Sequence, residues 1–318
     1  MDKHLLLAVS GMLLASGIAY SQAYPSKPVR IIVATGGGSP DDVVTRLIAP
    51  KLGELLGQQF VVDNRPGAAG LIGQSAAANS PPDGYTLLYA GGSMTGAKYV
   101  NANVRYDVLR DFTPISTLTT GKFFLVVHPK VPARNLKEYI ALARSRPGQM
   151  TYVTTGPGQT PYWNAVLFNS MAGIKAVEVP YKISSEGVVD VIAGRVDYYF
   201  IGTPATVANK AKLRALAVTT ATRSTVLPEV PTIAEAALPG YDMPSWGSLV
   251  GPAGMRPDVV KTLNAAVVRV LGMPDIRERV SSIGSEPASS SPEQLSNQIA
   301  DWVERYGKIA KLVGIKPQ

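Results

Sequence analysis

The chain contains no cysteine among its 318 residues, and histidine occurs only twice. The missing cysteine excludes disulfides, thiolate metal sites and a lipid anchor on a cysteine. One or two histidines do not build a typical metal site, so we expect no metal and no cofactor. Charged residues make up only 17% of the chain, which leaves a catalytic pair of carboxylates unsupported. Because nucleophile-elbow and zinc-helix motifs are also missing, the sequence favours a protein that is not an enzyme.

Long apolar runs are also scarce, and the one that stands out extends from Leu5 to about Ile18. Polar residues precede this run, and small residues follow it up to Ala23. This order is typical of a secretory signal peptide, so we predict a signal over 1–23 and a mature chain that starts at Tyr24. A membrane anchor, the alternative, needs about 20 apolar residues, and serine and glycine dilute this run. We therefore expect no membrane anchor after cleavage.

Acidic residues are fewer than basic ones, and the formal net charge is +8. This balance favours anionic partners through long-range attraction but does not bear on the fold. The basic residues are scattered singly rather than clustered, and an exported protein has little opportunity to meet nucleic acid. We therefore expect no nucleic-acid partner.

Short apolar runs alternate with amphipathic segments along most of the chain. The apolar runs predict strands over 29–34, 59–63, 85–90, 123–127, 151–154, 176–179, 196–201 and 213–219. The other segments predict helices over 42–56, 71–79, 136–145, 161–171, 186–193, 257–271, 274–282 and 292–313. Pro50 should kink or split the first helix, and Asn135 should cap the third. The alternation predicts an α/β fold with mostly parallel sheets and helices on both faces.

The loop after the first predicted strand, Thr35–Asp42, combines three glycines with the hydroxyls of Thr35 and Ser39. Glycine lets the backbone approach a ligand closely, and a helix N-terminus offers free N–H groups and the positive end of the helix dipole. Such a turn is a natural seat for an anion. The simpler alternative is an ordinary strand–helix turn in which Asp42 caps the helix.

Three further loops, 64–70, 91–95 and 155–163, also follow strands and are rich in Gly, Ser, Thr or Ala. Ligands of open α/β sheets bind beyond these strand ends, so the four loops together predict one site. Arg65 is expected to brace its loop, and His128 to be structural. Tyr162 and Trp163 could divide between cleft and core, or both could be core residues. The candidate ligand-binding residues are Ala34, Thr35, Ser39, Asp42, Ala68, Ala69, Gly70, Ser93, Met94, Thr155, Gly156, Gln159, Thr160, Tyr162, Tyr181, Phe200 and Gly202.

An ordered set of motifs covers nearly the whole mature chain. It comprises YPSKPVR (24–30), Gly37-Gly38 with Asp42 and Arg46, NRPGAAG (64–70), DGYTLL (83–88), DFTPIS (111–116), VPYK (179–182), LRALAVT (213–219), LPEVPT (227–232) and LPGY (238–241). In this set the chain resembles the Bug-type solute receptors of tripartite tricarboxylate transporters, which are periplasmic proteins of Gram-negative bacteria.

The resemblance implies a type II-like periplasmic binding protein, in which two α/β domains joined by two crossover segments close on a ligand like a Venus flytrap. Domain 1 would comprise 24–120 plus 246–318, and domain 2 would comprise 121–245. We expect hinges near 118–122 and 243–246. The resemblance also implies a monomeric receptor that holds a small carboxylate through backbone N–H groups and hydroxyls, without an Arg or Lys ion pair, and that delivers it to membrane permease subunits.

Three departures from the family pattern concern the ligand. Ala34 and Thr35 replace an aromatic residue and a proline, Pro-Tyr-Trp at 161–163 stands where Ser and His are usual, and Ile201 replaces an Asp that could meet an amino group. We therefore hypothesise a dicarboxylate without an amine, aromatic in one version, with Tyr162 or Trp163 flanking its ring. A sensor that presents the carboxylate to a two-component signalling partner stays open as an alternative. A secreted hydrolase or transferase is disfavoured, because His128 is the one histidine of the mature chain.

Overall fold

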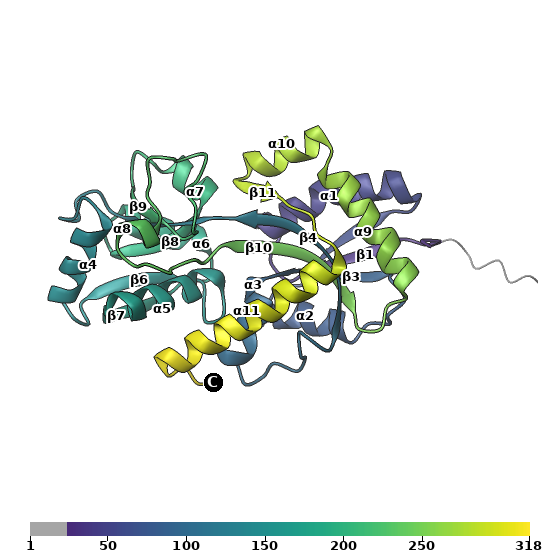
Figure 1. Ribbon diagram of the computed structural model, residues 1–318, viewed down its shortest axis with the longest axis horizontal. Coiled ribbons are helices and arrows are strands. Elements are labelled where there is room, and N and C mark those ends of the chain that lie inside the picture. Colours follow the sequence, from purple (N-terminus) through teal and green to yellow (C-terminus); the bar gives the residue numbers. More distant parts are fainter. Residues whose placement is uncertain (1–23) are drawn as a thin grey trace, which may run out of the picture.

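The computed structural model describes residues 24–318 and shows two lobes side by side, each built around one β-sheet (Figure 1). The predicted signal peptide and its cleavage site after Ala23 lie outside the described residues. Two long strands, β4 (Phe112–Gly121) and β10 (Ser245–Pro252), run through the middle of the molecule and pair with each other. Within this described part, no helix combines the length and the apolar character needed to span a bilayer.

The sheet of the first lobe has the strand order β11-β4-β10-β3-β1-β2. Its other strands are β1 (Val29–Val33), β2 (Phe60–Asn64), β3 (Thr86–Gly91) and β11 (Ser285–Pro287). One face packs in a core shared with α1 (Pro40–Leu56), α9 (Pro257–Leu271) and α10 (Pro274–Ser282). The other face packs against α2 (Leu71–Ala78) and α11 (Pro292–Val313). Alternate side chains of the buried strands therefore serve two separate cores.

The sheet of the second lobe has the order β7-β6-β8-β5-β9. The strands are β5 (Phe123–Val127), β6 (Met150–Thr154), β7 (Ala176–Pro180), β8 (Tyr198–Gly202) and β9 (Arg214–Val218). One face shares a core with α4 (Leu136–Ser145), α5 (Thr160–Ala172) and α8 (Ile233–Ala236). The opposite face is covered by α6 (Ser184–Ile192) and α7 (Thr203–Ala208). Both lobes thus have the predicted α/β layers.

Both sheets are mixed, which corrects the expectation of mostly parallel sheets. Parallel pairing is confined to β1 with β2 and β3, and to β6 with β7 and β8. The remaining neighbours run antiparallel. The reason is the double crossing between lobes: β4 carries the chain toward the second lobe and β10 brings it back. Apolar periodicity does not reveal strand direction, so the sequence could not show this reversal.

The crossings lie where hinges were predicted. Only Lys122 separates the end of β4 from the start of β5, and its Nζ lies 2.5 Å from Oε1 of Glu286 in β11. The chain returns through the segment that ends at Ser245, the first residue of β10. Helix α11, yellow in Figure 1, also touches the second lobe, because Tyr306 packs on Trp163 of α5 with ring centroids 4.7 Å apart. Hinge motion at the crossings stays a prediction.

The element predictions succeed where sequence signals coincide. The bounds of β5, α4, α9, α10 and α11 are those predicted, and the Asn135 side chain caps α4 by accepting from the Glu138 N–H at 2.9 Å. Helix α1 runs continuously through Pro50, so Pro50 does not split it, and the alternative of a kink stays a prediction. The elements that the prediction missed are short or lack an apolar run. They are β4, β10, β11, α3 (Gly92–Gly96), α7, α8 and the 3₁₀ turns η1 (Ala68–Gly70) and η2 (Ala97–Tyr99).

The cap of α11 allows a direct test. Ser291 Oγ accepts from the Gln294 N–H at 3.1 Å, and Gln294 Oε1 accepts from the Ser291 N–H at 2.8 Å. Ser291→Ala should lower the free energy of unfolding by about 1 kcal/mol in urea denaturation, because a helix N–H loses its partner. Ser289→Ala, at an exposed serine two residues earlier, is the matched control and should change little. Equal stability of the two variants would contradict the cap.

Candidate functional site

The first loop joins β1 to α1 and is organised around Ser39. Its Oγ accepts from the Asp42 N–H at 3.2 Å and lies 2.7 Å from the Thr35 hydroxyl. Pro40 occupies the first helical position, where no N–H is needed. Ser39 is therefore the cap, and the alternative that gave this role to Asp42 is wrong. An added Cβ at Gly36 or Gly37 would meet nothing within 4 Å, so this loop faces open space.

Asp42 is buried behind the loop, with its side chain 4% exposed. Its carboxylate accepts from the Gly38 N–H at 2.8 Å, from Arg46 Nε at 2.9 Å and from Asn64 Nδ2 at 2.9 Å. Burial alone would raise the pKa of this carboxyl, but the hydrogen bonds from Arg46, Gly38 and Asn64 outweigh it and hold the pKa below its usual value. With these three donors the carboxylate braces the first loop, and a direct contact of Asp42 with a ligand stays a prediction.

The second loop has a strained backbone. Ala68 and Ala69 adopt left-handed conformations with φ of 47° and 56°, between Gly67 at 121° and Gly70 at 96°. Left-handed residues other than glycine cost energy and concentrate at functional sites. Arg65 forms an ion pair with Asp63 at 2.8 Å, in agreement with the expected bracing role. The strain holds a loop of tiny side chains at the N-terminus of α2, the end of a helix at which anions bind.

The four loops meet where the lobes face each other. Asn64 Nδ2 of the second loop donates to the Thr35 carbonyl of the first loop at 3.2 Å, so the first two loops touch. Gln159 Nε2 of the fourth loop donates to the Ala69 carbonyl at 3.1 Å, across the two lobes. A cavity of about 10 Å³, the space of a single water, joins the last three loops. Its lining is Ala69, Leu71, Ser93, Ala97, Val100, Asn101, Pro157 and Gly158.

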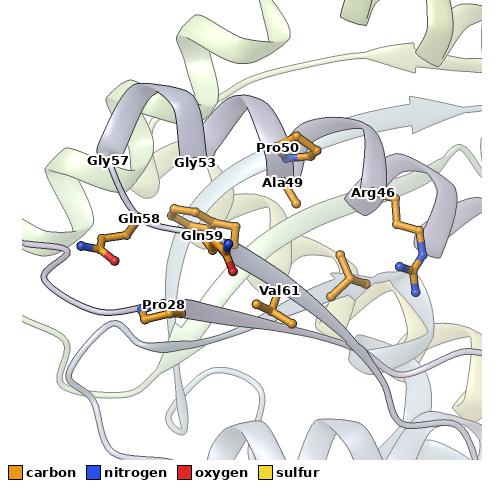
Figure 2. A pocket seen from close by; sticks show the side chains of 11 residues that line it. Pro28, Arg46, Ala49, Pro50, Gly53, Gly57, Gln58, Gln59 and Val61 are labelled. Carbon is orange, nitrogen blue, oxygen red and sulfur yellow. The ribbon is translucent and has the colours of Figure 1, made fainter.

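A much larger hollow, of about 920 Å³, lies away from these loops on the outer side of the first lobe (Figure 2). It runs between α1 and the edge strand β2. The helix has no long side chains at Pro50, Gly53 and Gly57, which line the hollow. Arg46 is its one charged residue, and that guanidinium already serves Asp42 and Asn64. The hollow therefore lacks the free convergent donors that a small anion needs.

Comparison with known proteins is consistent with this geometry. Residues 44–315 match the tripartite tricarboxylate transporter family receptor, TctC. The chain belongs to this receptor family. The receptor is 34% identical to protein BugT of Bordetella pertussis, over 98% of each chain. Two similar solved structures come from Rhodopseudomonas palustris. Rpa4515 with adipate is 34% identical, with a TM-score of 0.85, and the match covers 93% of this chain and 100% of that one. MatC with bound malate is 27% identical, with a TM-score of 0.81, and the match covers 90% of this chain and 100% of that one.

Most of the candidate residues lie at the receptor's facing loops. Gly202 also faces the first lobe, because it precedes α7, and an added Cβ on Gly284 of the first lobe would lie 2.4 Å from Pro204 Cδ. Neighbouring pairs among the candidates are Ala34 with Gly70, Thr35 with Ser39, Ala69 with Gln159, and Ala69 with Ser93. Ala68, Thr155, Gly156, Thr160 and Gly202 lie on the same loops or at the ends of the neighbouring strands and helices. Whether each of them contacts a ligand stays a prediction.

Four further candidates pack in the core or are bound to a neighbouring side chain, and their contact with a ligand stays a prediction. Phe200 is 1% exposed and packs on Phe168 and Tyr198, because its position in β8 points into the core. Met94 is likewise a core residue. The Tyr181 hydroxyl is bound to Asp190 of α6. Tyr162 is 8% exposed and packs edge-on against Trp163.

Trp163 itself is fully buried, and its ring packs at a tilt against that of Tyr306. With both rings of the 162–163 pair in the core, the structure does not support the hypothesis of an aromatic ligand flanked by one of them. This outcome agrees with the alternative in which both are core residues.

The prediction missed two polar side chains near the loops. The Trp246 indole N–H is buried without a hydrogen-bond partner in the described chain, and an added Cβ on Gly92 of the third loop would lie 3.6 Å from it. Such a donor suits a water or a ligand oxygen. Asp41 faces Tyr89 of β3, and burial raises the pKa of its carboxyl to about 6. The adjacent Asp41-Asp42 pair was a visible signal, but the sequence did not show which carboxylate is braced.

Proposed function

We propose that this receptor captures a small dicarboxylate in the periplasm and delivers it to the membrane permease subunits of a tripartite transporter. The observation that carries the proposal is the meeting of four Gly-, Ser- and Thr-rich loops between the lobes. The adipate and malate in the two related structures support the ligand class.

The proposed anion-binding site uses helix dipoles and hydroxyl groups instead of a cationic side chain. The N-termini of α1 and α2 point their N–H groups into the region of the first two loops, beside the hydroxyls of Thr35 and Ser39. Arg46 and Arg65, the nearby guanidinium groups, are engaged by Asp42 and Asp63. Fixed backbone donors lose little entropy when the anion arrives, so an ion pair is not needed for tight capture.

Capture is proposed to proceed by closure of two domains, 24–120 plus 246–318 and 121–245, in a monomeric protein. The contact of Gln159 with Ala69 and that of Pro204 with Gly284 would form as the lobes close. A ligand held from both sides then stabilises the closed form through its differential affinity for it.

The experiment is a thermal-shift screen of the protein that begins at Tyr24 against aliphatic and aromatic dicarboxylates, tricarboxylates and acidic amino acids. A ligand at 100 times its Kd should stabilise the protein by about 2.7 kcal/mol, which raises Tm by several degrees. No shift with any carboxylate, on folded ligand-free protein, would contradict the proposal.

A matched pair of variants tests the location of the seat. Ala69 is exposed with φ of 56°, a conformation that Asp and Asn tolerate. Ala69→Asp places a negative charge at the seat and should abolish the ligand-induced shift, whereas the isosteric Ala69→Asn should retain most of it. An equal ligand-induced rise in Tm in the two variants would mean that the anion does not bind beside Ala69.

A further inference from the structure

The indole N–H of Trp246 is an unpaired donor beside two of the four loops. The Trp246 side chain is 7% exposed, and its Nε1 is buried without a hydrogen-bond partner among the described residues. A buried donor without a partner costs free energy, so native proteins rarely leave one. Because an indole can only donate, the partner it lacks is an acceptor, such as a carboxylate oxygen.

Three polar groups converge on Gly92, the first residue of α3 in the third loop. An added Cβ on Gly92 would lie 3.2 Å from the Tyr306 hydroxyl oxygen, 3.6 Å from Trp246 Nε1 and 3.9 Å from Thr160 Oγ1. These are the three atoms nearest to that point, and they belong to uncharged side chains of three different elements, α11, β10 and α5. The surroundings of Gly92 can therefore offer several hydrogen bonds to one acceptor group.

The same place is the N-terminus of α5. Thr160 is the first residue of this 13-residue helix. The N–H groups at the start of a helix and the positive end of its dipole favour an anion. Thr160 belongs to the second lobe, whereas Gly92 and Tyr306 belong to the first, so the place is bounded from both lobes. An acceptor can enter when the lobes separate, and it is enclosed when they close.

We infer that Trp246 determines the preference of the receptor for dicarboxylates, because its indole N–H donates to the second carboxylate of the ligand at the N-terminus of α5. The inference rests on the proposed function, in which the first two loops hold the first carboxylate. Ser93, the residue after Gly92, lines one cavity with Ala69 of the second loop, so the two ends of the site adjoin. A ligand with a single carboxylate leaves the N–H unpaired on closure, whereas a dicarboxylate of suitable length pairs it.

The test compares each dicarboxylate with the monocarboxylate of the same length: adipate with hexanoate, and succinate with butyrate. Calorimetry at pH 7.5, where these carboxylates are ionised, gives the ratio of the monocarboxylate Kd to the dicarboxylate Kd. The ratio should be well above one in the wild type. Trp246→Phe should lower it by about tenfold or more, because a hydrogen bond to a charged group is lost.

Trp163→Phe is the matched control. It removes another buried indole N–H that has no partner among the described residues. An added Cβ on Gly96 would lie 2.4 Å from this Nε1, so the backbone of α3 covers it and leaves no space for a ligand oxygen. Trp163→Phe should therefore keep the wild-type Kd ratio, even if both ligands of a pair bind more weakly.

A second pair of variants tests the place without removing the indole. The methyl group of Gly92→Ala would lie in front of the Trp246 N–H, so this variant should also lose the preference for dicarboxylates. The methyl group of Gly91→Ala would meet the Trp246 carbonyl oxygen at 3.2 Å instead, and this variant should keep the preference.

A wild-type Kd ratio in Trp246→Phe or in Gly92→Ala would overturn the inference, and the binding of adipate or succinate would leave the proposed function intact. A wild type that binds hexanoate and butyrate as tightly as the matching dicarboxylates would overturn it as well. If no dicarboxylate of the thermal-shift screen binds, the inference and the proposed function are both overturned.

Discussion

Replacing Gly247 with alanine should lower the free energy of unfolding by roughly 3 kcal/mol or more, a severe effect for a single methyl group. Gly247 lies in β10 between β3 and β4, and its added Cβ would be 1.8 Å from the Tyr89 hydroxyl oxygen and 2.4 Å from Cζ. Tyr89 is 6% exposed, and its hydroxyl is held near Thr119, so the ring has no free space to enter. The measurement is urea denaturation followed by circular dichroism.

The control for this prediction is Gly91→Ala. Gly91 is paired directly with Gly247 in the neighbouring strand, but its added Cβ meets only the Trp246 carbonyl oxygen at 3.2 Å. Its destabilisation should therefore be much smaller. Adding Tyr89→Leu to Gly247→Ala should recover part of the loss, because the two positions compete for one space. A mild effect of Gly247→Ala alone would show that the ring can move away.

The sequence predicts elements well where local signals decide them. Helices such as α9, α10 and α11 begin with proline and carry an apolar stripe, and their bounds match the prediction. Strand β4 has no such signal, because its serines and threonines are buried by partners distant in the chain. Thr117, for example, bonds to Ser290, and Thr119 lies beside Tyr89. Only tertiary contacts make this polar segment a central strand.

The candidate site shows the same limit at finer scale. The four loops could be predicted because each combines a strand end with small residues, and the structure brings them together. The different roles of Asp41 and Asp42 could not be predicted, because the side chains of consecutive helix residues point in directions about 100° apart. That rotation sends Asp42 toward Asn64 on β2 and Asp41 toward Tyr89 on β3. The local sequence does not predict which strand packs on which side of α1.

Asp42→Ala should combine a loss of stability with a loss of capture. Its carboxylate holds the Gly38 N–H, Arg46 and Asn64 together, and the variant leaves these donors without their acceptor. We expect a decrease of roughly 2–3 kcal/mol in the free energy of unfolding at pH 7. The ligand-induced thermal shift should also shrink, because the first loop loses the contact that fixes Gly38. Asp258→Ala is the matched control: it removes a first-turn Asp that is paired with Arg256 but exposed, and stability should hardly change.

The effect of Asp42 should depend on pH in a defined direction. Its pKa is lower in the folded protein than in the unfolded chain, so the unfolded chain binds the proton more readily. The stabilisation is therefore complete above the unfolded value of about 4 and is lost as pH falls through the folded pKa. Urea denaturation from pH 7 toward pH 3 should show the gap between wild type and Asp42→Ala narrowing in acid. If the difference in the free energy of unfolding between wild type and Asp42→Ala stays constant over this range, the ionised form of the Asp42 carboxyl does not contribute to stability.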